Sequence, residues 1–306
     1  MIPIVVQALP SSLAQAKQIA ARLSVTCDEI AIHKFPDDEI RVTVKPAAAI
    51  AIIYAPLDHP NDKLLALLLA SDALRQGGAR RLVLVAPYLC YMRQDTAFQP
   101  GEAVSQKVVG KVLAGAFDRI VTVDAHLHRT HEIREVFPRI EADNLSAMPA
   151  IADSLRATGF DRAAIVVGPD SESEPWVSDL AARLALPYIA ARKTRHGDRS
   201  VQIELPKPEA VLGRPVLLVD DLVSSGGTLA VCARALAAAG ASSIDAIVTH
   251  ALFPPETMDE FARAGIRSIR STNSISHFTN AIALDSLLAQ ALEKEIRQIR
   301  PGTTVK

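Results

Sequence analysis

Short apolar runs rich in β-branched residues alternate with longer amphipathic stretches, and this alternation limits the fold more than any other feature of the chain. Strand-like runs lie at residues 2–6, 50–56, 81–87, 119–126, 163–170, 215–221 and 245–253. Helix-like stretches lie at residues 11–23, 61–79, 173–186 and 228–241. Strands that are apolar on both sides and alternate with helices are typical of a parallel sheet covered on both faces. The sequence therefore predicts an α/β fold.

The chain is long enough for two domains of similar size. Its 306 residues correspond to about two domains of roughly 150 residues each. The predicted strand–helix units fall into two comparable halves, with a seam near residues 144–150. We expect domains at residues 1–145 and 146–306. The last predicted helix, at residues 285–299, could also pack on the first domain.

The composition excludes several classes of protein. A hydrophobic content of 49% supports buried cores, and a formal net charge of −1 argues against a dedicated nucleic-acid surface. The apolar run that begins at Leu64 is far shorter than the ~20 residues that cross a bilayer, and the N-terminus lacks the pattern of a secretory signal. Cys27, Cys90 and Cys232 are widely spaced and odd in number, which fits reduced thiols. We expect a cytoplasmic protein that binds neither nucleic acid nor membranes.

Two segments depart from the strand–helix alternation and predict hairpins. Residues 30–44 alternate around a turn at 36–38, and residues 191–205 surround a Gly-Asp turn at 197–198. We interpret the second segment as a mobile hairpin or lid that carries positive charge. Its five basic residues are Arg192, Lys193, Arg195, His196 and Arg199.

Several predicted strands end in polar or charged residues. In open α/β sheets, ligands bind beyond the carboxyl ends of the strands. These residues are therefore expected to face one cleft or two related clefts. They are Asp124, His126, Asp170, Asp220, Asp221 and His250.

Residues 216–229 combine two carboxylates with a loop suited to a phosphate. The strand ends in Asp220 and Asp221, and the next turn supplies backbone N–H groups, three hydroxyls and two glycines that let the backbone approach a ligand. The helix that begins near Thr228 adds the positive end of its dipole. The carboxylates would repel a phosphate, but they suit sugar hydroxyls or a magnesium ion on the same ligand. A sugar phosphate satisfies both halves of this motif, whereas the alternative is an ordinary strand-to-helix turn.

The stretch VLLVDDLVSSGGTL resembles the motif with which phosphoribosyltransferases and synthetases of phosphoribosyl diphosphate (PRPP) bind this compound. Five further motifs, KFPDDEIRV, YMRQDTAFQPGEAVS, VDAHLH, GPDSE and RKTR, occur in the order and spacing of ribose-phosphate diphosphokinase, the PRPP synthetase. The resemblance covers essentially the full chain, and the short FQPGEAVS connection is similar to the compact, archaeal-type branch of the family. It implies two tandem phosphoribosyltransferase-like domains, each a mainly parallel sheet flanked by helices.

The resemblance implies an enzyme that transfers the β,γ-diphosphoryl group of ATP to the C1 hydroxyl of ribose 5-phosphate. The products are AMP and PRPP, a precursor for nucleotide biosynthesis, and Mg²⁺ is the implied cofactor. Lys193 matches the catalytic lysine of the family, and Arg195 is expected to contact the sugar phosphate or the transition state. Asp220 and Asp221 would face the ribose hydroxyls and the metal. The implied 5-phosphate loop consists of Ser224, Ser225, Gly226, Gly227 and Thr228.

The first predicted hairpin matches the segment that grips adenine in the family, where it usually comes from a neighbouring subunit. A homo-oligomer, at least a dimer, is therefore expected; the alternative is a simple turn with a half-buried Phe35. Asp95 is a weaker match and could simply pair with Arg93. The residues implied to bind ATP are Phe35, Asp37, Asp38, Glu39, Arg93 and Gln94.

His126 and Asp170 match family positions that contact magnesium or the ATP phosphates. The spacing of His126, His128 and His131 would also suit zinc, but the segment has no cysteine partners. Magnesium suits a carboxylate combined with substrate phosphate oxygens and water.

The sequence departs from the family at two places in the predicted sugar-phosphate site. Residues 171–174 read Ser-Glu-Ser-Glu where the family commonly has small, glycine-rich residues, and these carboxylates should disfavour a nearby anion. Ser224 stands where many members carry an aspartate, a change that retains a hydrogen-bonding group.

Two other functions compete with PRPP synthesis. One is a phosphoribosyltransferase that consumes PRPP, and the other is a non-catalytic regulatory subunit of a PRPP synthetase. The tandem architecture and the presence of Lys193, Arg195 and His126 argue against the first. The retention of the expected catalytic residues argues against the second.

Overall fold

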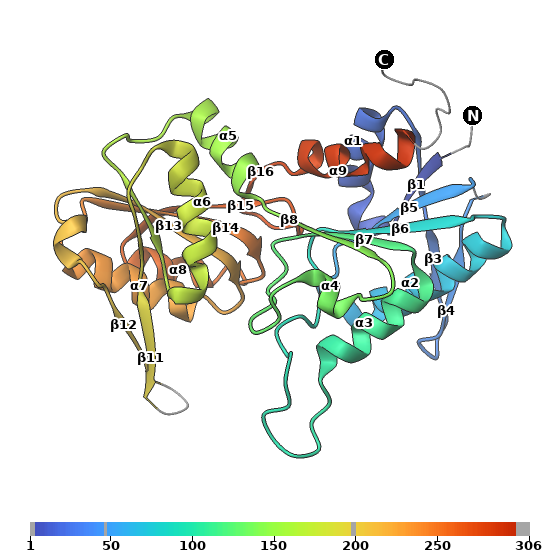
Figure 1. Cartoon of the computed structure of the whole chain (residues 1–306), viewed down its shortest axis with the longest axis horizontal. Coiled ribbons are helices and arrows are strands. Elements are labelled where there is room, and N and C mark those ends of the chain that lie inside the picture. The colour runs from blue at the N-terminus through green and yellow to red at the C-terminus, as the bar shows by residue number, and fades with distance from the viewer. Residues whose placement is uncertain (1–3, 46–47, 197–199, 298–306) are drawn as a thin grey trace. The chain divides into compact units, whose positions relative to one another are not determined.

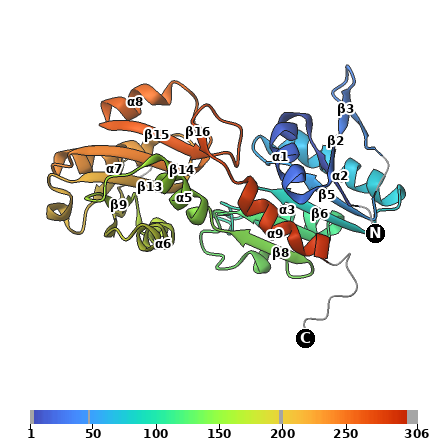
Figure 2. The same ribbon diagram turned by 90° about the horizontal axis from the view of Figure 1, so that it is seen from above.

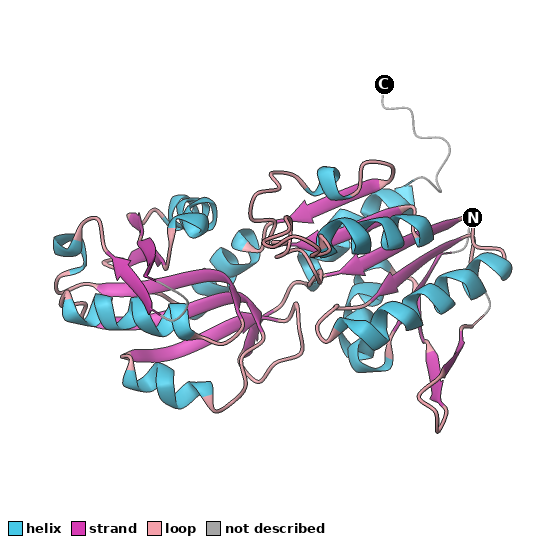
Figure 3. Ribbon diagram, turned by 90° about the horizontal axis from the view of Figure 1, so that it is seen from below, coloured by secondary structure: helices cyan, strands magenta, loops and turns pink. Residues whose placement is uncertain are grey.

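The computed structural model describes residues 4–45, 48–196 and 200–297, with the side chains of residues 193–202 excepted. The chain forms two compact units, Met1–Leu145 with Asp285–Lys306, and Ser146–Leu284. The helix at the end of the chain therefore belongs to the first unit. Each unit is a parallel sheet with helices on both faces, and Figure 3 shows the strands as a layer between the helices. The predicted α/β fold with two parallel-sheet domains is confirmed.

The N-terminal unit is built on a six-stranded sheet of order β2-β1-β5-β6-β7-β8, in which all neighbours are parallel. Helices α2 and α3 pack on one face with the short α4, and α1 and α9 pack against each other on the other face (Figures 1 and 2). The strands are β1 (Ile4–Ala8), β2 (Thr26–Glu29), β5 (Ile50–Tyr54), β6 (Arg81–Ala86), β7 (Arg119–Val123) and β8 (Glu141–Leu145). The helices are η1 (Pro10–Ser12), α1 (Leu13–Leu23), α2 (Pro60–Gln76), α3 (Ser105–Ala116), α4 (Ile133–Val136) and α9 (Asp285–Arg297).

The C-terminal unit repeats this plan with a sheet of order β10-β9-β13-β14-β15-β16. Its strands are also parallel, and α7 and α8 cover the face opposite α5 and α6. The strands are β9 (Ile165–Gly168), β10 (Tyr188–Ala190), β13 (Pro215–Val223), β14 (Ser243–Ala251), β15 (Ile266–Thr272) and β16 (Asn280–Ile282). The helices are α5 (Met148–Thr158), η2 (Ser171–Ser173), α6 (Glu174–Leu184), η3 (Pro208–Val211), α7 (Gly227–Ala238) and α8 (Thr257–Arg263).

Each unit carries an antiparallel hairpin between its second and third sheet strands. In the N-terminal unit β3 (Ala31–Lys34) pairs with β4 (Ile40–Thr43), and in the C-terminal unit β11 (Arg192–His196) pairs with β12 (Ser200–Glu204). Figure 1 shows both hairpins extending from the sheets that carry them. The predicted turn at residues 197–198 lies outside the described residues.

Local sequence explains why these elements form. In α1 the buried residues are Ala16, Ile19, Ala20 and Leu23, a spacing that places all four on one face of a helix. In β5 every residue of Ile50–Tyr54 is buried, as expected for a strand covered on both faces. Amphipathic helices and two-sided strands together require the layered arrangement that is observed.

A buried ionic cluster joins α9 to the sheet of the N-terminal unit. The side chain of Glu295 is fully buried and accepts hydrogen bonds from Arg81 at 2.6 and 3.0 Å and from Arg119 at 2.9 Å. Arg119, itself 2% exposed, also donates to the carbonyl of Ala291 and to Asp143. These charges are compensated on every side, which is the condition for burying them.

Within the described part of the chain, no helix is both long and apolar enough to span a bilayer. Cys90 and Cys232 are buried and Cys27 is partly buried, and all three are free thiols.

Candidate active site

The loop after β13 presents hydroxyl groups and backbone to solvent directly beside two carboxylates. Ser224 and Ser225 are exposed, and Asp220 and Asp221 lie within the last residues of β13. Helix α7 begins at Gly227, so the backbone N–H groups of its first turn follow directly after this loop. An anion in this loop would meet backbone donors and the positive end of the helix dipole.

Gly226 is the one position of this loop that only glycine can occupy without strain. Its φ of +83° lies in the left-handed region, and a Cβ atom there would stand 2.7 Å from the ring of Phe261 and 2.7 Å from the methyl of Thr257. Phe261 is 1% exposed and packs edge-on against Phe253 at 5.1 Å between ring centroids. The loop therefore lies on a tightly packed floor that holds its backbone in place.

Replacing Gly226 with alanine is expected to destabilise the protein by about 2 kcal/mol, because strain and overpacking act together. Gly227→Ala is the matched control, since the nearest atom to a Cβ there is Ser225 Oγ at 4.0 Å. Urea unfolding should show a loss for Gly226→Ala and almost none for Gly227→Ala. Equal stability of the two variants would contradict this account of the loop.

The two carboxylates at the end of β13 are close to each other and poorly solvated. Asp221 is 2% exposed, and its N–H donates to Asp220 Oδ1 at 3.1 Å. Desolvation raises the pKa of Asp220 well above its ordinary value, and the negative charges of Asp221 and Asp170 raise it further. A site with this electrostatic character favours a cation, and its oxygen donors suit Mg²⁺.

The raised pKa of Asp220 makes stability depend on pH. Between the pKa of the unfolded carboxyl, about 3.9, and the higher folded value, the native protein binds a proton that the unfolded chain has lost. The free energy of unfolding should therefore decrease as pH rises through this window. Asp220→Asn removes the charge, so the variant should be more stable than the wild type at pH 7, and the two should converge near pH 4. Urea unfolding of both proteins between pH 4 and 8, without magnesium, tests this prediction. An Asp220→Asn variant that is less stable than the wild type at both pH 4 and pH 8 would contradict it.

Asp170 has a structural role beside any role in metal binding. It follows β9, and its Oδ1 accepts hydrogen bonds from the N–H groups of Glu172 at 3.1 Å and Ser173 at 3.3 Å, which caps η2. Among the described side chains, no group of three His, Cys, Asp or Glu residues converges to hold a metal. Magnesium binding would thus depend on a few carboxylates together with oxygens of a substrate and water.

The histidines considered for zinc do not form such a group. The rings of His126 and His128 are 6.1 Å apart between centroids and nearly perpendicular, and His128 and His131 are exposed. His126 follows β7 in the N-terminal unit, while Asp170 follows β9 in the C-terminal unit.

The tip of the first hairpin is exposed and well ordered by its own contacts. Phe35 is 37% exposed; its N–H donates to Glu39 O at 2.8 Å, and it accepts at its own carbonyl from Asp38 N–H. His33 packs edge-on against the Phe35 ring at 4.7 Å. The Glu39 N–H donates to Asp37 at 3.3 Å. The hairpin therefore presents an aromatic face and carboxylates outward.

Arg93 and Gln94 lie in the segment between β6 and α3. Arg93 is exposed, while Gln94 accepts a hydrogen bond from the Ser105 hydroxyl at 2.5 Å and, at its carbonyl, from the Gln106 N–H. The alternative pairing of Asp95 with Arg93 is wrong. Asp95 instead accepts from the backbone N–H of Arg129 at 2.7 Å and from its guanidinium at 3.2 Å.

Arg129 is a residue that sequence reasoning missed. Burial alone would raise the pKa of Asp95, yet its hydrogen bonds with Arg129 lower it below the ordinary value. This pair joins the segment of Arg93 and Gln94 to the segment that follows His126. No local pattern marks Arg129, because its partner lies 34 residues away in the sequence.

The predicted lysine and arginine of the second hairpin are described only by their backbone. In β11, Lys193 pairs with Ile203 of β12, and Arg195 pairs with Val201.

Two known domain families match this chain, one in each of the two units. The N-terminal domain of ribose phosphate pyrophosphokinase matches residues 4–116, and the phosphoribosyl transferase domain matches residues 144–278. Ribose-phosphate pyrophosphokinase 2 of Archaeoglobus fulgidus is 32% identical over 92% of this chain and 97% of its own length.

The chain belongs to the ribose-phosphate pyrophosphokinase family.

Other relatives of this pyrophosphokinase family agree. The ribose-phosphate pyrophosphokinase of Methanopyrus kandleri is 28% identical over 94% of this chain and 98% of its own length. The crystal structure of phosphoribosylpyrophosphate synthetase from Mycobacterium smegmatis superposes with a TM-score of 0.82 at 25% identity, covering 97% of this chain and 99% of that one. The chain thus spans nearly the whole length of these relatives, and it belongs to an enzyme family of diphosphotransferases.

The unusual Ser-Glu-Ser-Glu segment of this pyrophosphokinase has a packing explanation. Ser173 is 1% exposed and lies so close to Gly168 that a Cβ on the glycine would be 2.0 Å from Ser173 Oγ. The Ser173 hydroxyl donates to the carbonyl of Asp170. Glu172 and Glu174 are exposed. The serine thus completes the turn after β9, while the predicted weakening of anion binding by the two glutamates stays a prediction.

Proposed function

We propose that the protein transfers the diphosphoryl group of ATP to the C1 hydroxyl of ribose 5-phosphate, giving PRPP and AMP with Mg²⁺ as cofactor. The observation that carries this proposal is the exposed hydroxyl-rich loop beside the desolvated Asp220–Asp221 pair, in a chain whose full-length relatives are ribose-phosphate pyrophosphokinases. A phosphate in the loop would place the sugar hydroxyls toward the carboxylates.

The chain's own residues would position the substrates and balance their charge. Ser224 to Thr228 would bind the 5-phosphate, while Asp220 and Asp221 would orient the ribose and hold magnesium, which neutralises phosphate charge when bound. His126 and Asp170 would take part in metal or ATP-phosphate contacts. In the transfer, the C1 oxygen forms a bond to the β-phosphorus of ATP, the bond from that phosphorus to the α,β-bridging oxygen breaks, and AMP leaves with the electron pair. The hydroxyl proton passes to solvent.

Lys193 and Arg195 would complete the site from the second hairpin. Cationic groups that close over both substrates stabilise charge as it moves from the β-phosphorus to the leaving AMP. ATP would be held by Arg93, Gln94 and the exposed hairpin tip with Phe35, Asp37, Asp38 and Glu39. Because this tip faces outward, it suits contact with a neighbouring copy in a homo-oligomer of at least two chains.

The test is an assay of AMP formation with purified protein, Mg²⁺, ATP and ribose 5-phosphate. We expect AMP and PRPP in equal amounts, and no AMP when ribose 5-phosphate is omitted. A phosphoribosyltransferase would instead release diphosphate from PRPP only when a nucleobase is present, and a regulatory subunit would produce neither. Either of those results would overturn the proposal.

A further inference from the structure

The segment that carries His126 begins with a sharp turn of the backbone directly after β7. Val123, the last residue of β7, pairs with Leu145 of β8 in the parallel ladder. The next residue, Asp124, has a φ of +38°, a value that residues other than glycine rarely adopt. Asp124 is also 3% exposed, so the turn is buried. A buried backbone in such a conformation persists only where neighbouring groups hold it.

The end of β8 supplies two hydrogen bonds that hold this turn. The N–H of Asp124 donates to the carbonyl of Leu145 at 2.8 Å, and the N–H of Ala125 donates to the side-chain Oδ1 of Asn144 at 2.9 Å. The first bond joins two backbone groups, so any residue at position 145 could accept it. The second bond requires an acceptor atom at the end of the side chain at position 144. The identity of residue 144 therefore decides whether the turn is fully held.

The rest of the segment is held as well. Arg129 donates its backbone N–H to Asp95 at 2.7 Å. Ala125 is 5% exposed and Leu127 is 9% exposed, and both belong to the core of the N-terminal unit, whereas His126 between them is partly exposed. The backbone is thus fixed on both sides of His126, which is the arrangement that holds a functional side chain in one place.

The position of Asn144 indicates a role in the site rather than in the core. Asn144 is exposed at the carboxyl end of β8, beside the carboxyl end of β7. In open α/β sheets this is the edge at which ligands bind. Because the side chain is exposed, replacing it with alanine opens no cavity in the core. The effect of such a change should be confined to the turn at Asp124 and Ala125.

We propose that Asn144 is a positioning residue for the transfer reaction. Its side chain fixes the backbone at Ala125, and the fixed backbone places the ring of His126 for contact with magnesium or the ATP phosphates. This role rests on the proposed function, in which His126 makes that contact. A ring on a fixed backbone loses less conformational freedom when a substrate binds than a ring on a mobile segment.

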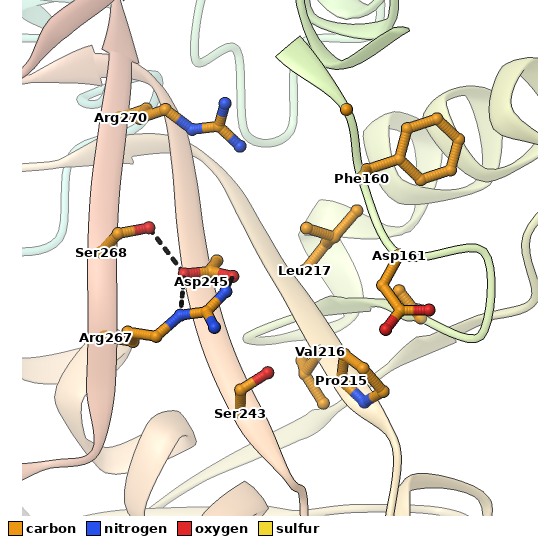
Figure 4. A pocket seen from close by; sticks show the side chains of 12 residues that line it. Phe160, Asp161, Pro215, Val216, Leu217, Ser243, Asp245, Arg267, Ser268 and Arg270 are labelled. Atoms are coloured by element: carbon orange, nitrogen blue, oxygen red, sulfur yellow. Dashed lines mark hydrogen bonds and ion pairs between the residues drawn. The ribbon is translucent and has the colours of Figure 1, made fainter.

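A hydrogen bond at the opposite end of the other sheet offers a matched control. Ser268 of β15 donates its hydroxyl to Asp245 of β14 at 2.6 Å, and Figure 4 shows this bond. Both residues line a pocket of about 540 Å³ at the amino ends of β13 and β14, together with Arg267, which also pairs with Asp245. Ser268→Ala removes one side-chain hydrogen bond, as Asn144→Ala does, but at the end of the sheet away from the carboxylate pair.

Steady-state AMP formation, with MgATP and ribose 5-phosphate varied in turn, tests the role of Asn144. We expect Asn144→Ala to raise the KM for MgATP about tenfold, the usual effect of removing a group that orients a ligand of a metal or phosphate. The KM for ribose 5-phosphate should change less than about twofold, because only uniform binding of ATP is affected. Ser268→Ala should leave both constants unchanged. A general loss of folded protein would lower kcat and leave both KM values as they are.

Hydrogen exchange at the Ala125 amide, followed by mass spectrometry without substrates or magnesium, tests the same bond independently of the reaction. In Asn144→Ala this amide should exchange about tenfold faster than in the wild type, because its N–H has lost its acceptor. Asn144→Asp keeps an acceptor of the same size. It should retain slow exchange and a KM for MgATP below that of Asn144→Ala.

Three results would overturn the proposal. The first is slow exchange of Ala125 in every variant, and the second is an unchanged KM for MgATP in Asn144→Ala. The third is a KM in Asn144→Asp as high as in Asn144→Ala while exchange stays slow, because the amide of Asn144 would then bind the substrate directly. If no protein forms AMP, the proposed function fails, while the exchange comparison still decides whether Asn144 holds the turn.

Discussion

Replacing Lys193 with alanine is expected to lower kcat for AMP formation by about 10²- to 10³-fold, the usual effect of removing one preorganised group that stabilises transition-state charge. The role of Lys193 comes from the RKTR motif of the second hairpin, whose antiparallel strands the structure shows. A lysine that acts only when both substrates are bound contributes little to ATP binding alone. The variant should therefore bind ATP with nearly unchanged affinity.

Steady-state AMP formation and equilibrium ATP binding, measured on the same preparations, check both parts of this prediction. Lys207→Ala is the control, because Lys207 is an exposed lysine shortly after the same hairpin. It should leave kcat within about twofold, since surface charges far from the reacting atoms contribute little. Wild-type turnover of the Lys193→Ala variant would show that Lys193 is not catalytic. A loss of ATP affinity in this variant would show that Lys193 already stabilises bound ATP before the transfer.

Replacing Glu295 with alanine is expected to destabilise the protein by about 3 kcal/mol, because the buried Arg119 loses the one of its two carboxylate partners that is fully buried. Arg119 is 2% exposed and would retain only Asp143 and the carbonyl of Ala291 as partners. The loss should appear in urea unfolding of the whole chain. This expected loss of stability rests on the buried ionic cluster and does not depend on which reaction the protein catalyses.

Glu293→Ala is the matched control on the same helix. Glu293 forms an exposed pair with Arg297 at 2.6 Å, and such pairs contribute about 0.5 kcal/mol or less. Glu295→Gln should give an intermediate loss, because the amide keeps the shape but not the charge. A Glu295→Ala variant as stable as the Glu293→Ala variant would show that the buried cluster contributes nothing to stability.

The layered α/β fold and the exposed, hydroxyl-rich turn between β13 and α7 were both predictable from local sequence. Strands buried on both sides and helices with one apolar face leave few arrangements other than a covered parallel sheet. Asp220, Asp221 and Gly226 all lie within residues 220–226, so the carboxylates and the glycine turn can be recognised in one short stretch of sequence. The exposed tip around Phe35 was also predictable, because a polar turn between alternating residues has little to bury.

Other features could not be predicted from the sequence, because they depend on contacts between residues that are far apart along the chain. The Asp95–Arg129 pair spans 34 residues, and the sequence suggested the neighbouring Arg93 instead. The close packing of Ser173 against Gly168 explains the serine at position 173 of the Ser-Glu-Ser-Glu segment. The sequence alone drew attention only to the two carboxylates of this segment.

The sequence by itself determined the class of fold, the two halves of the chain and the loop at residues 224–228, because each depends on residues close together along the chain. Only the tertiary structure decided that α9 joins the N-terminal unit, since its apolar face would suit either sheet. Burial of Glu295 between Arg81 and Arg119, 214 and 176 residues away, settles that choice. A buried carboxylate is stable only where basic side chains are placed to pair with it. Arg81 and Arg119 provide such partners on the sheet of the N-terminal unit.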